Sequence, residues 1–197
     1  IGTSGGEFVV RASSDEPISP TNTQILRQAS YGSANIQPVA VANVVLFVQR
    51  AKRKLRELVY SFGSDSYFAP DLTILSENIT DGLIKEIALQ QEPDNIVWCV
   101  LENGKFVGMT YRREEEVVAW HDHEIGGTFT DSGTTYGYGF VESVATIPSS
   151  TGTEDEVYIV VARTIGGATK RYIERLKPID FGTSVEDAFF VDSGLTY

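Results

Sequence analysis

The chain has 197 residues, with 16 Lys and Arg against 27 Asp and Glu, so its formal net charge at pH 7 is −11. This balance argues against a protein that grips nucleic acid through its phosphates, because such binding needs clustered basic side chains. A hydrophobic content of 42% is that of a chain with a buried core, and no apolar run is long enough to span a membrane.

The predicted elements are strands joined by tight turns, since β-branched and aromatic residues dominate the apolar set and the chain has 18 glycines. In chain order, the expected strands are Glu7–Arg11, Gln24–Ala29, Val39–Gln49, Leu72–Leu75, Leu83–Leu89, Ile96–Glu102, Lys105–Arg112, Glu116–His121, Phe140–Ile147, Glu156–Arg163, Thr169–Leu176 and Asp187–Val191. Asn103–Gly104 and Gly166–Gly167 lie between such runs and predict two-residue hairpin turns, because these residues tolerate a positive φ. The sequence therefore predicts an all-β protein.

One segment, residues 51–58, contains only good helix formers and by propensity alone would be a helix. However, the Asn103–Gly104 hairpin matches this region when it is moved back by 51 residues. Val97, Trp98 and Phe106 then fall on Leu46, Phe47 and Leu55, and the basic run falls on the hairpin tip. We therefore expect a hairpin over residues 44–60, with a helix as the alternative.

A third copy of this pattern follows about 60 residues after the second, where Val157–Val161 matches Ile96–Val100. A period of about 50–60 residues with about four strands per unit is typical of the blades of a β-propeller. We predict the end of a preceding β-unit and a linker over 1–30, three repeated antiparallel units over about 31–80, 81–130 and 131–180, and the start of a following β-segment over 181–197. The expected fold is a partial, propeller-like array, with a β-sandwich as the alternative. Because the chain opens on Ile1 without a Met, we expect it to be a piece of a longer protein.

Few residues point to catalysis or metal binding. His121 and His123 would share one face of a strand and could reach one metal ion, but they are the only histidines and provide too few ligands for a zinc site. Cys99, the single cysteine, is expected to be a small buried apolar residue. Carboxylates are abundant, yet nothing in the sequence indicates which two would face one another. We predict no enzymatic activity, no catalytic residue, no cofactor and no metal.

Two similar segments, 131–136 and 192–197, share the pattern Asp-Ser-Gly-x-Thr-Tyr. They are similar to the second half of an Asp-box, a turn motif of sialidase-like propellers, although Phe129 and Phe190 replace the serine that should precede the aspartate. In such a motif the carboxylate bonds the local backbone of a hairpin. The pattern indicates architecture and no catalysis.

The one basic cluster on this acidic chain consists of Arg50, Lys52, Arg53, Lys54 and Arg56. At a hairpin tip these side chains could contact an acidic neighbouring subunit or a phosphate, and the alternative is a solvated turn. Tyr67, Phe68 and residues 136–140 are aromatic and could stack on a sugar or a base, whereas packing between strands or against a partner is the simpler interpretation.

Several phrases in the chain occur in the order found in a family of tail proteins from bacteriophages and prophages. They are Gly2–Glu7, Ser19–Asn22, Tyr31–Ala34, Pro38–Val39, Asp71–Thr73, Gln91–Trp98, Gly104–Tyr111, Val118–His121 and Arg171–Leu176. The chain resembles the central part of these proteins, which are similar to the tubular or nozzle proteins of short-tailed phages. Lys105 and Cys99 depart from the usual residues of the family.

The resemblance implies a structural role in the phage tail, with propeller-like domains around a channel through which DNA leaves. It implies assembly into a ring of about six subunits, contact with other tail proteins, and transient passage of phage DNA without specific binding or membrane insertion. Before assembly, a prophage-encoded copy would be in the bacterial cytoplasm. The alternatives are a glycan-binding or glycan-cleaving propeller that recognises host surface sugars, and an adaptor that presents strand edges to partners.

Overall fold

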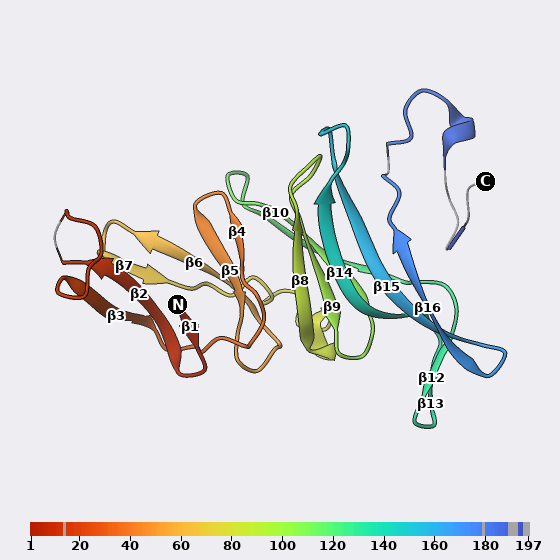
Figure 1. Cartoon of the computed structure of the whole chain (residues 1–197), viewed down its shortest axis with the longest axis horizontal. Helices are drawn as coiled ribbons and strands as arrows, with labels where there is room; N and C mark the ends of the chain where they lie inside the picture. The colour runs from red at the N-terminus through yellow and green to blue at the C-terminus, as the bar shows by residue number, and fades with distance from the viewer. Residues whose placement is uncertain (14, 179, 189–192, 195–197) are drawn as a thin grey trace. The chain divides into compact units, whose positions relative to one another are not determined.

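The computed structural model shows two compact units, Ile1–Ile84 and Lys85–Tyr197 (Figure 1). It describes residues 1–13, 15–178, 180–188, 193 and 194. These residues form antiparallel strands and two short 3-10 helices, Thr80–Gly82 (η1) and Val185–Asp187 (η2), with no α-helix among them. The prediction of an all-β protein is confirmed.

The first unit contains two antiparallel sheets. The three-stranded sheet is formed by β1 (Gly2–Thr3), β2 (Gly6–Ala12) and β3 (Thr23–Ala29), and the four-stranded sheet by β4 (Val39–Val41), β5 (Val44–Val48), β6 (Leu55–Ser61) and β7 (Ser66–Phe68). The predicted hairpin over 44–60 is confirmed as β5 and β6, which pair from Val45–Leu58 to Val48–Leu55. Helix propensity is overridden here because extended backbone buries Leu46, Val48 and Leu55 almost completely.

Two expected strands of the first unit differ from the structure. The single run Val39–Gln49 is interrupted at Ala42, whose φ of 50° makes the turn between β4 and β5. The expected strand Leu72–Leu75 is wrong, because these residues form a turn. Asp71 holds this turn, since its Oδ1 accepts hydrogen bonds from the Thr73 N–H at 2.9 Å and the Thr73 hydroxyl at 2.5 Å.

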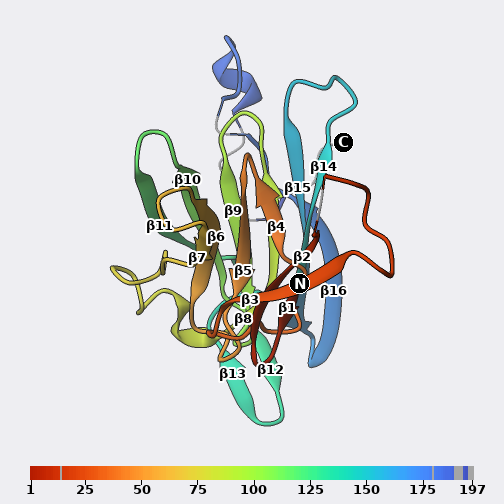
Figure 2. The same cartoon turned by 90° about the vertical axis from the view of Figure 1, so that its left-hand side faces the viewer.

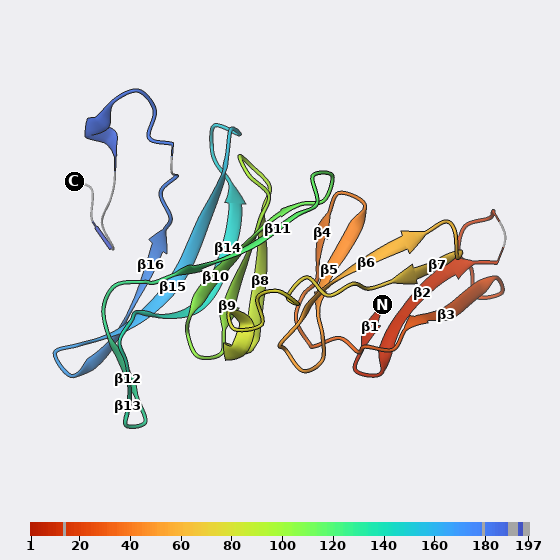
Figure 3. The ribbon, with the colours of Figure 1, turned by 180° about the vertical axis from the view of Figure 1, so that it is seen from behind.

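The second unit contains a four-stranded sheet, a three-stranded sheet and a separate hairpin. The four-stranded sheet has the order β11-β10-β9-β8, with β8 (Ile84–Gln90), β9 (Ile96–Leu101), β10 (Phe106–Arg112) and β11 (Val117–His123). The three-stranded sheet has the order β14-β15-β16, with β14 (Phe140–Pro148), β15 (Asp155–Ile165) and β16 (Ala168–Arg175). Both predicted hairpin turns are confirmed, with Gly104 at φ 80° and Gly167 at φ 78°. The hairpin of β12 (Phe129–Asp131) and β13 (Thr134–Tyr136), visible from behind in Figure 3, was not among the expected strands.

The two larger sheets of the second unit share one core. Trp98 and Phe106 stack with ring centroids 4.9 Å apart and pack against the apolar residues of the facing sheet. Those residues are Val141, Val144, Val157, Ile159 and Val161. Cys99 is fully buried, as predicted, and burial raises the pKa of its thiol.

Strands β8 and β14, whose ribbons can be followed in Figure 2, are the inner edges of these sheets, and side chains link the two strands. Lys85 Nζ donates to the carbonyl oxygen of Glu142 at 2.8 Å, and the Thr146 hydroxyl donates to the carbonyl oxygen of Leu89 at 2.8 Å. The outer edges of the two sheets are therefore β11 and β16.

The predicted repeat can be compared with these sheets. Strands β4–β7 and β8–β11 are both four-stranded antiparallel meanders, whereas β14–β16 is a three-stranded one. A closed arrangement of such units around an axis, as in a propeller, stays a prediction. The expected segment over 181–197 lies partly outside the described residues.

Candidate functional site

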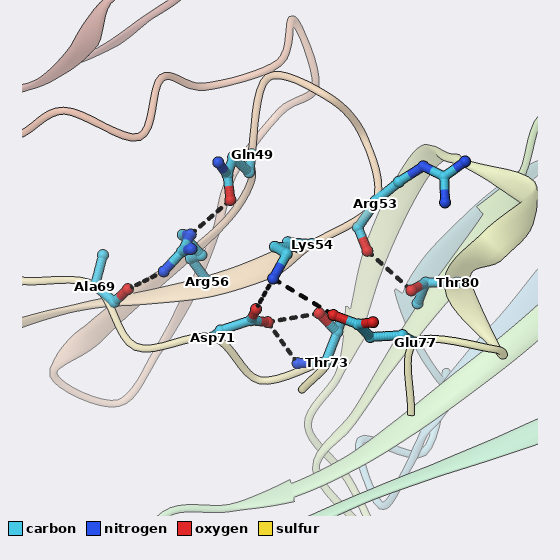
Figure 4. A network of polar contacts seen from close by, with 9 residues as sticks. All are labelled: Gln49, Arg53, Lys54, Arg56, Ala69, Asp71, Thr73, Glu77 and Thr80. Atoms are coloured by element: carbon cyan, nitrogen blue, oxygen red, sulfur yellow. Dashed lines mark hydrogen bonds and ion pairs between the residues drawn. The ribbon is translucent and has the colours of Figure 1, made fainter. Parts of the chain in front are cut away.

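The predicted basic cluster lies in the turn between β5 and β6 and in the first residues of β6 (Figure 4). The Gln49 N–H donates to the Lys54 carbonyl at 2.8 Å, and Lys52 has a φ of 62°, so the turn is tight. The five basic residues therefore leave the turn in different directions, and each has its own surroundings.

Arg56 is a buried part of the fold, with a relative exposure of 9%. Its guanidinium donates to the Gln49 side-chain oxygen at 2.8 Å and to the Ala69 carbonyl at 2.6 Å, and it lies 3.7 Å from the centroid of the Tyr31 ring. A planar guanidinium can make these contacts at the same time, which an ammonium cannot. Arg56 therefore joins three segments of the first unit.

Lys54 and Arg53 are held by carboxylates of the following loop. Lys54 Nζ lies 2.6 Å from Asp71 and 3.5 Å from Glu77, and Arg53 lies 3.2 Å from Asp81. The hydrogen bond with Asp71 raises the pKa of Lys54. Burial by itself would raise the pKa of Asp71, but the hydrogen bonds from Lys54 and Thr73 outweigh this effect and lower it.

The other two basic residues, Arg50 and Lys52, border an open polar hollow of about 410 Å³. Its remaining lining residues are Gly2, Thr3, Ser4, Ser33, Ala34 and Asn35. Arg50 donates weakly to the Ser4 carbonyl at 3.4 Å, across this hollow. The structure thus separates the five predicted residues into the buried Arg56, the pair Arg53 and Lys54 bound to carboxylates of the next loop, and the pair at the hollow. Their use as a subunit or phosphate contact stays a prediction.

The two histidines meet, as their spacing on a strand predicts. His121 Nδ1 and His123 Nε2 are 2.7 Å apart, and the ring centroid of His123 lies 4.9 Å from that of Trp98. Burial lowers the pKa of both imidazoles, against the opposing effect of Asp122. At 2.7 Å one of these ring nitrogens must donate a hydrogen bond to the other. A proton on both ring nitrogens would therefore place two N–H groups face to face.

No third ligand completes a metal site at this pair. Within the described ranges, no group of three or more His, Cys, Asp or Glu side chains lies close enough together to hold a metal ion. The pair instead covers the end of the core, beside Trp98 and Phe106.

The predicted Asp-box-like segment 131–136 forms the β12–β13 hairpin, with Ser132 and Gly133 at positive φ. Asp131 accepts a hydrogen bond from the Ser132 hydroxyl at 3.2 Å, which is a side-chain contact and not the backbone contact expected for the motif. Most of its second copy, 192–197, lies outside the described residues. The rings of the Tyr136–Phe140 segment pack on one another and on β12, with the centroid of Phe140 5.3 Å from that of Tyr136 and 4.9 Å from that of Phe129.

Sequence reasoning did not single out the two outer edge strands of the second unit, β11 and β16. Seven of the eight residues of β16 are exposed, including Tyr172 and Ile173. The sequence shows that these segments are strands, but which strands end a sheet depends on the pairing.

No protein-family model matches the sequence, and a comparison with curated proteins finds no significant match. Among the residues that the structure describes, none forms a helix with the length and apolar character needed to cross a membrane.

We predict that Arg56→Ala lowers the free energy of unfolding by about 2–4 kcal/mol, because it leaves the Ala69 carbonyl and Gln49 without their donor. Arg56→Lys should restore only part of this loss, since an ammonium cannot bond both groups and cover Tyr31. Arg53→Ala is the matched control, and because its ion pair is exposed it should change stability by about 0.5 kcal/mol or less. Urea unfolding measures all three, and equal effects of Arg56→Ala and Arg53→Ala would contradict the structural role of Arg56.

The histidine pair should make stability depend on pH. The folded pKa of both histidines lies below the ordinary 6.5, so the unfolded chain takes up protons first as the pH falls. The stability that the neutral histidines contribute is fully present above the ordinary pKa of 6.5, and it is lost as the pH falls through the lowered pKa values. We predict that a His121→Gln, His123→Gln variant loses less stability than the wild type between about pH 7.5 and pH 5.5. Urea unfolding at both pH values tests this, and identical losses would show that the pair does not resist protonation.

Proposed function

We propose that the chain is a non-enzymatic structural module of a phage tail, of the nozzle or tube type, that forms part of the DNA-ejection conduit through oligomeric assembly. The ordered phrases shared with phage tail proteins support this proposal, and so does the all-β fold built from repeated antiparallel sheets.

The observation that carries the proposal is the exposure of long edge strands. Strand β16 has eight residues at the end of its sheet, and Ile173 in its middle is 78% exposed. Strand β3 ends another sheet, and its Ile25 is 65% exposed. Proteins that function alone usually shorten, cover or charge such edges, because unpaired edges associate with other strands. Strands β16 and β3 are long edge strands on which apolar side chains stay exposed beside charged ones, which suits a module built for assembly.

The perturbed carboxylates also support a structural role. The hydrogen bond from Arg171 lowers the pKa of Glu142, and the hydrogen bond from Tyr158 lowers that of Glu156. Glu142 on β14 bonds Arg171 on β16, across β15, and Glu156 bonds Tyr158 of its own strand and pairs with Arg175 of β16, so each carboxylate belongs to a contact within one sheet. Such contacts fix the sheet and do not converge on a substrate.

The net charge of −11 is also compatible with a conduit. Like charges repel, so an acidic lumen would keep the DNA backbone from binding during ejection. Neutralising lumen carboxylates in the assembled tail would then slow ejection.

A second candidate function is glycan binding, which one feature of the first unit favours. Tyr60, Phe62 and Tyr67 form an edge-to-face cluster with centroid distances of 4.9 and 5.2 Å, and Phe62 is 92% exposed. Asp65 accepts a hydrogen bond from the Tyr60 hydroxyl at 2.5 Å beside this cluster. Exposed aromatic faces next to a carboxylate are suited to stacking on sugar rings.

Sedimentation velocity and negative-stain images of the 197-residue chain test the proposal. We predict concentration-dependent assembly into a ring with a central hole. A chain that stays monomeric at every concentration and binds immobilised glycans would contradict the tail proposal and support the second candidate. Phe62→Ala would then abolish glycan binding without changing the sedimentation coefficient.

A further inference from the structure

The sheets of the second unit end in two strands of opposite charge, and no described strand pairs with their outer edges. Strand β11 ends the four-stranded sheet and β16 ends the three-stranded sheet, while the inner edges β8 and β14 are linked to each other. Because main-chain groups along an edge strand can still pair, β11 and β16 are the strands where the two larger sheets of this unit could be extended.

The hydrogen-bond pattern shows which main-chain groups point outward. The Leu176 N–H donates to Val157 of β15, so by alternation the main-chain groups of Arg171 and Ile173 point away from β15. The Tyr111 N–H donates to Asn95, on the β9 side of β10, so those of its β11 partner Val118 point away from β10. Each outer edge therefore offers alternating donors and acceptors to a further strand.

The acidic edge is formed by β11 and its two flanks. Between residues 114 and 124 there are five carboxylates, all exposed, and no Lys or Arg. They are Glu114, Glu115, Glu116, Asp122 and Glu124. Val118, 41% exposed, adds an apolar side chain to the same edge.

The basic edge is formed by β16 and the residues that follow it. Arg171 and Arg175 are paired with Glu142 and Glu156 of their own sheet. Lys170 and Lys177 are exposed and make no ion pair within the part of the chain that the structure describes. They add positive charge next to the exposed Ile173, and Lys177 also helps to lower the pKa of Glu156.

We infer that the β11 edge of one copy of this chain pairs with the β16 edge of a second copy. In this contact, carboxylates of the β11 edge would lie opposite the lysines of the β16 edge. The apolar side chains of the two edges would also lie against each other. Pairing β16 with β16 or β11 with β11 would instead bring like charges together, which disfavours a two-fold dimer through these edges. Strand β3 carries only Arg27 as a charged residue, so it does not match the basic edge.

A contact between two different edges has a defined consequence for assembly. Each copy keeps one free edge of each kind, so copies add head to tail and form a closed ring or an open filament. The inference rests on the proposed assembly function and specifies the surface through which the chains associate.

Charge reversal tests this contact. The basic-edge variant carries Lys170→Glu and Lys177→Glu, the acidic-edge variant carries Glu114→Lys, Glu115→Lys and Glu124→Lys, and the control carries Asp15→Lys and Glu16→Lys, two exposed residues of the first unit. All changed side chains are exposed, so the fold should persist, which circular dichroism checks. Sedimentation velocity then gives the association constant of each variant alone and of the two edge variants mixed.

We expect each edge variant alone to associate about tenfold or more weakly than the wild type, and the control to associate like the wild type. The mixture should regain wild-type association. The acidic β11 edge of the basic-edge variant matches the unchanged β16 edge of the acidic-edge variant, and the two reversed edges match each other. Wild-type association of either edge variant alone, or a mixture that does not recover, would overturn the edge contact and leave the assembly function standing. A wild-type chain that never associates would instead overturn the proposed function itself.

Discussion

A β-strand satisfies its main-chain groups only when it has a neighbour on each side, and this requirement dominates the second unit. The central strands β9 and β10 meet it fully, and their side chains from Val97 to Leu101 are buried. The inner edges β8 and β14 are linked by Lys85 and Thr146 through single side-chain hydrogen bonds. No described strand lies along the outer edges of β11 and β16. The inner strands of the unit therefore have neighbours on both sides, whereas the two outer strands have a neighbour on one side.

The distribution of charge follows the same division. In the first unit, the basic residues around the β5–β6 turn are largely used inside the fold, where Lys54 meets Asp71 and Arg56 meets the Ala69 carbonyl. In the second unit, the carboxylates around β11 and the lysines around β16 remain at the surface. The net charge of the chain does not show which charged side chains are paired inside the fold and which remain at the surface, because an ion pair contributes nothing to the net charge.

Much of the fold could be predicted from local sequence. Asn103–Gly104 fixes a hairpin turn through positive φ, and the repeat of apolar positions identified residues 44–60 as a hairpin in spite of their helix propensity. The expected strand Leu72–Leu75 failed because Asp71 bonds Thr73 and turns the chain, a contact that apolar composition does not reveal. The β12–β13 hairpin is too short for a strand pattern to stand out.

The candidate sites were harder to predict, for physical reasons. The two-residue spacing of His121 and His123 does place them on one face, where they meet at 2.7 Å. The burial of Arg56, however, depends on Tyr31, Gln49 and Ala69, which come from three other segments. The exposure of the β16 edge likewise depends on which strands pair, and pairing between distant segments is not written in a local pattern.

Amide hydrogen exchange, measured residue by residue at low and at high protein concentration, tests edge-to-edge assembly most directly. The outward amides of Val118 on β11 and of Arg171 and Ile173 on β16 should exchange rapidly when the chain is dilute and become protected when it associates. The inward amides of Tyr172 and Glu174, which pair with β15, provide the internal reference because they should be protected in both conditions. Rapid exchange of the outward amides in the associated state would contradict assembly through these edges.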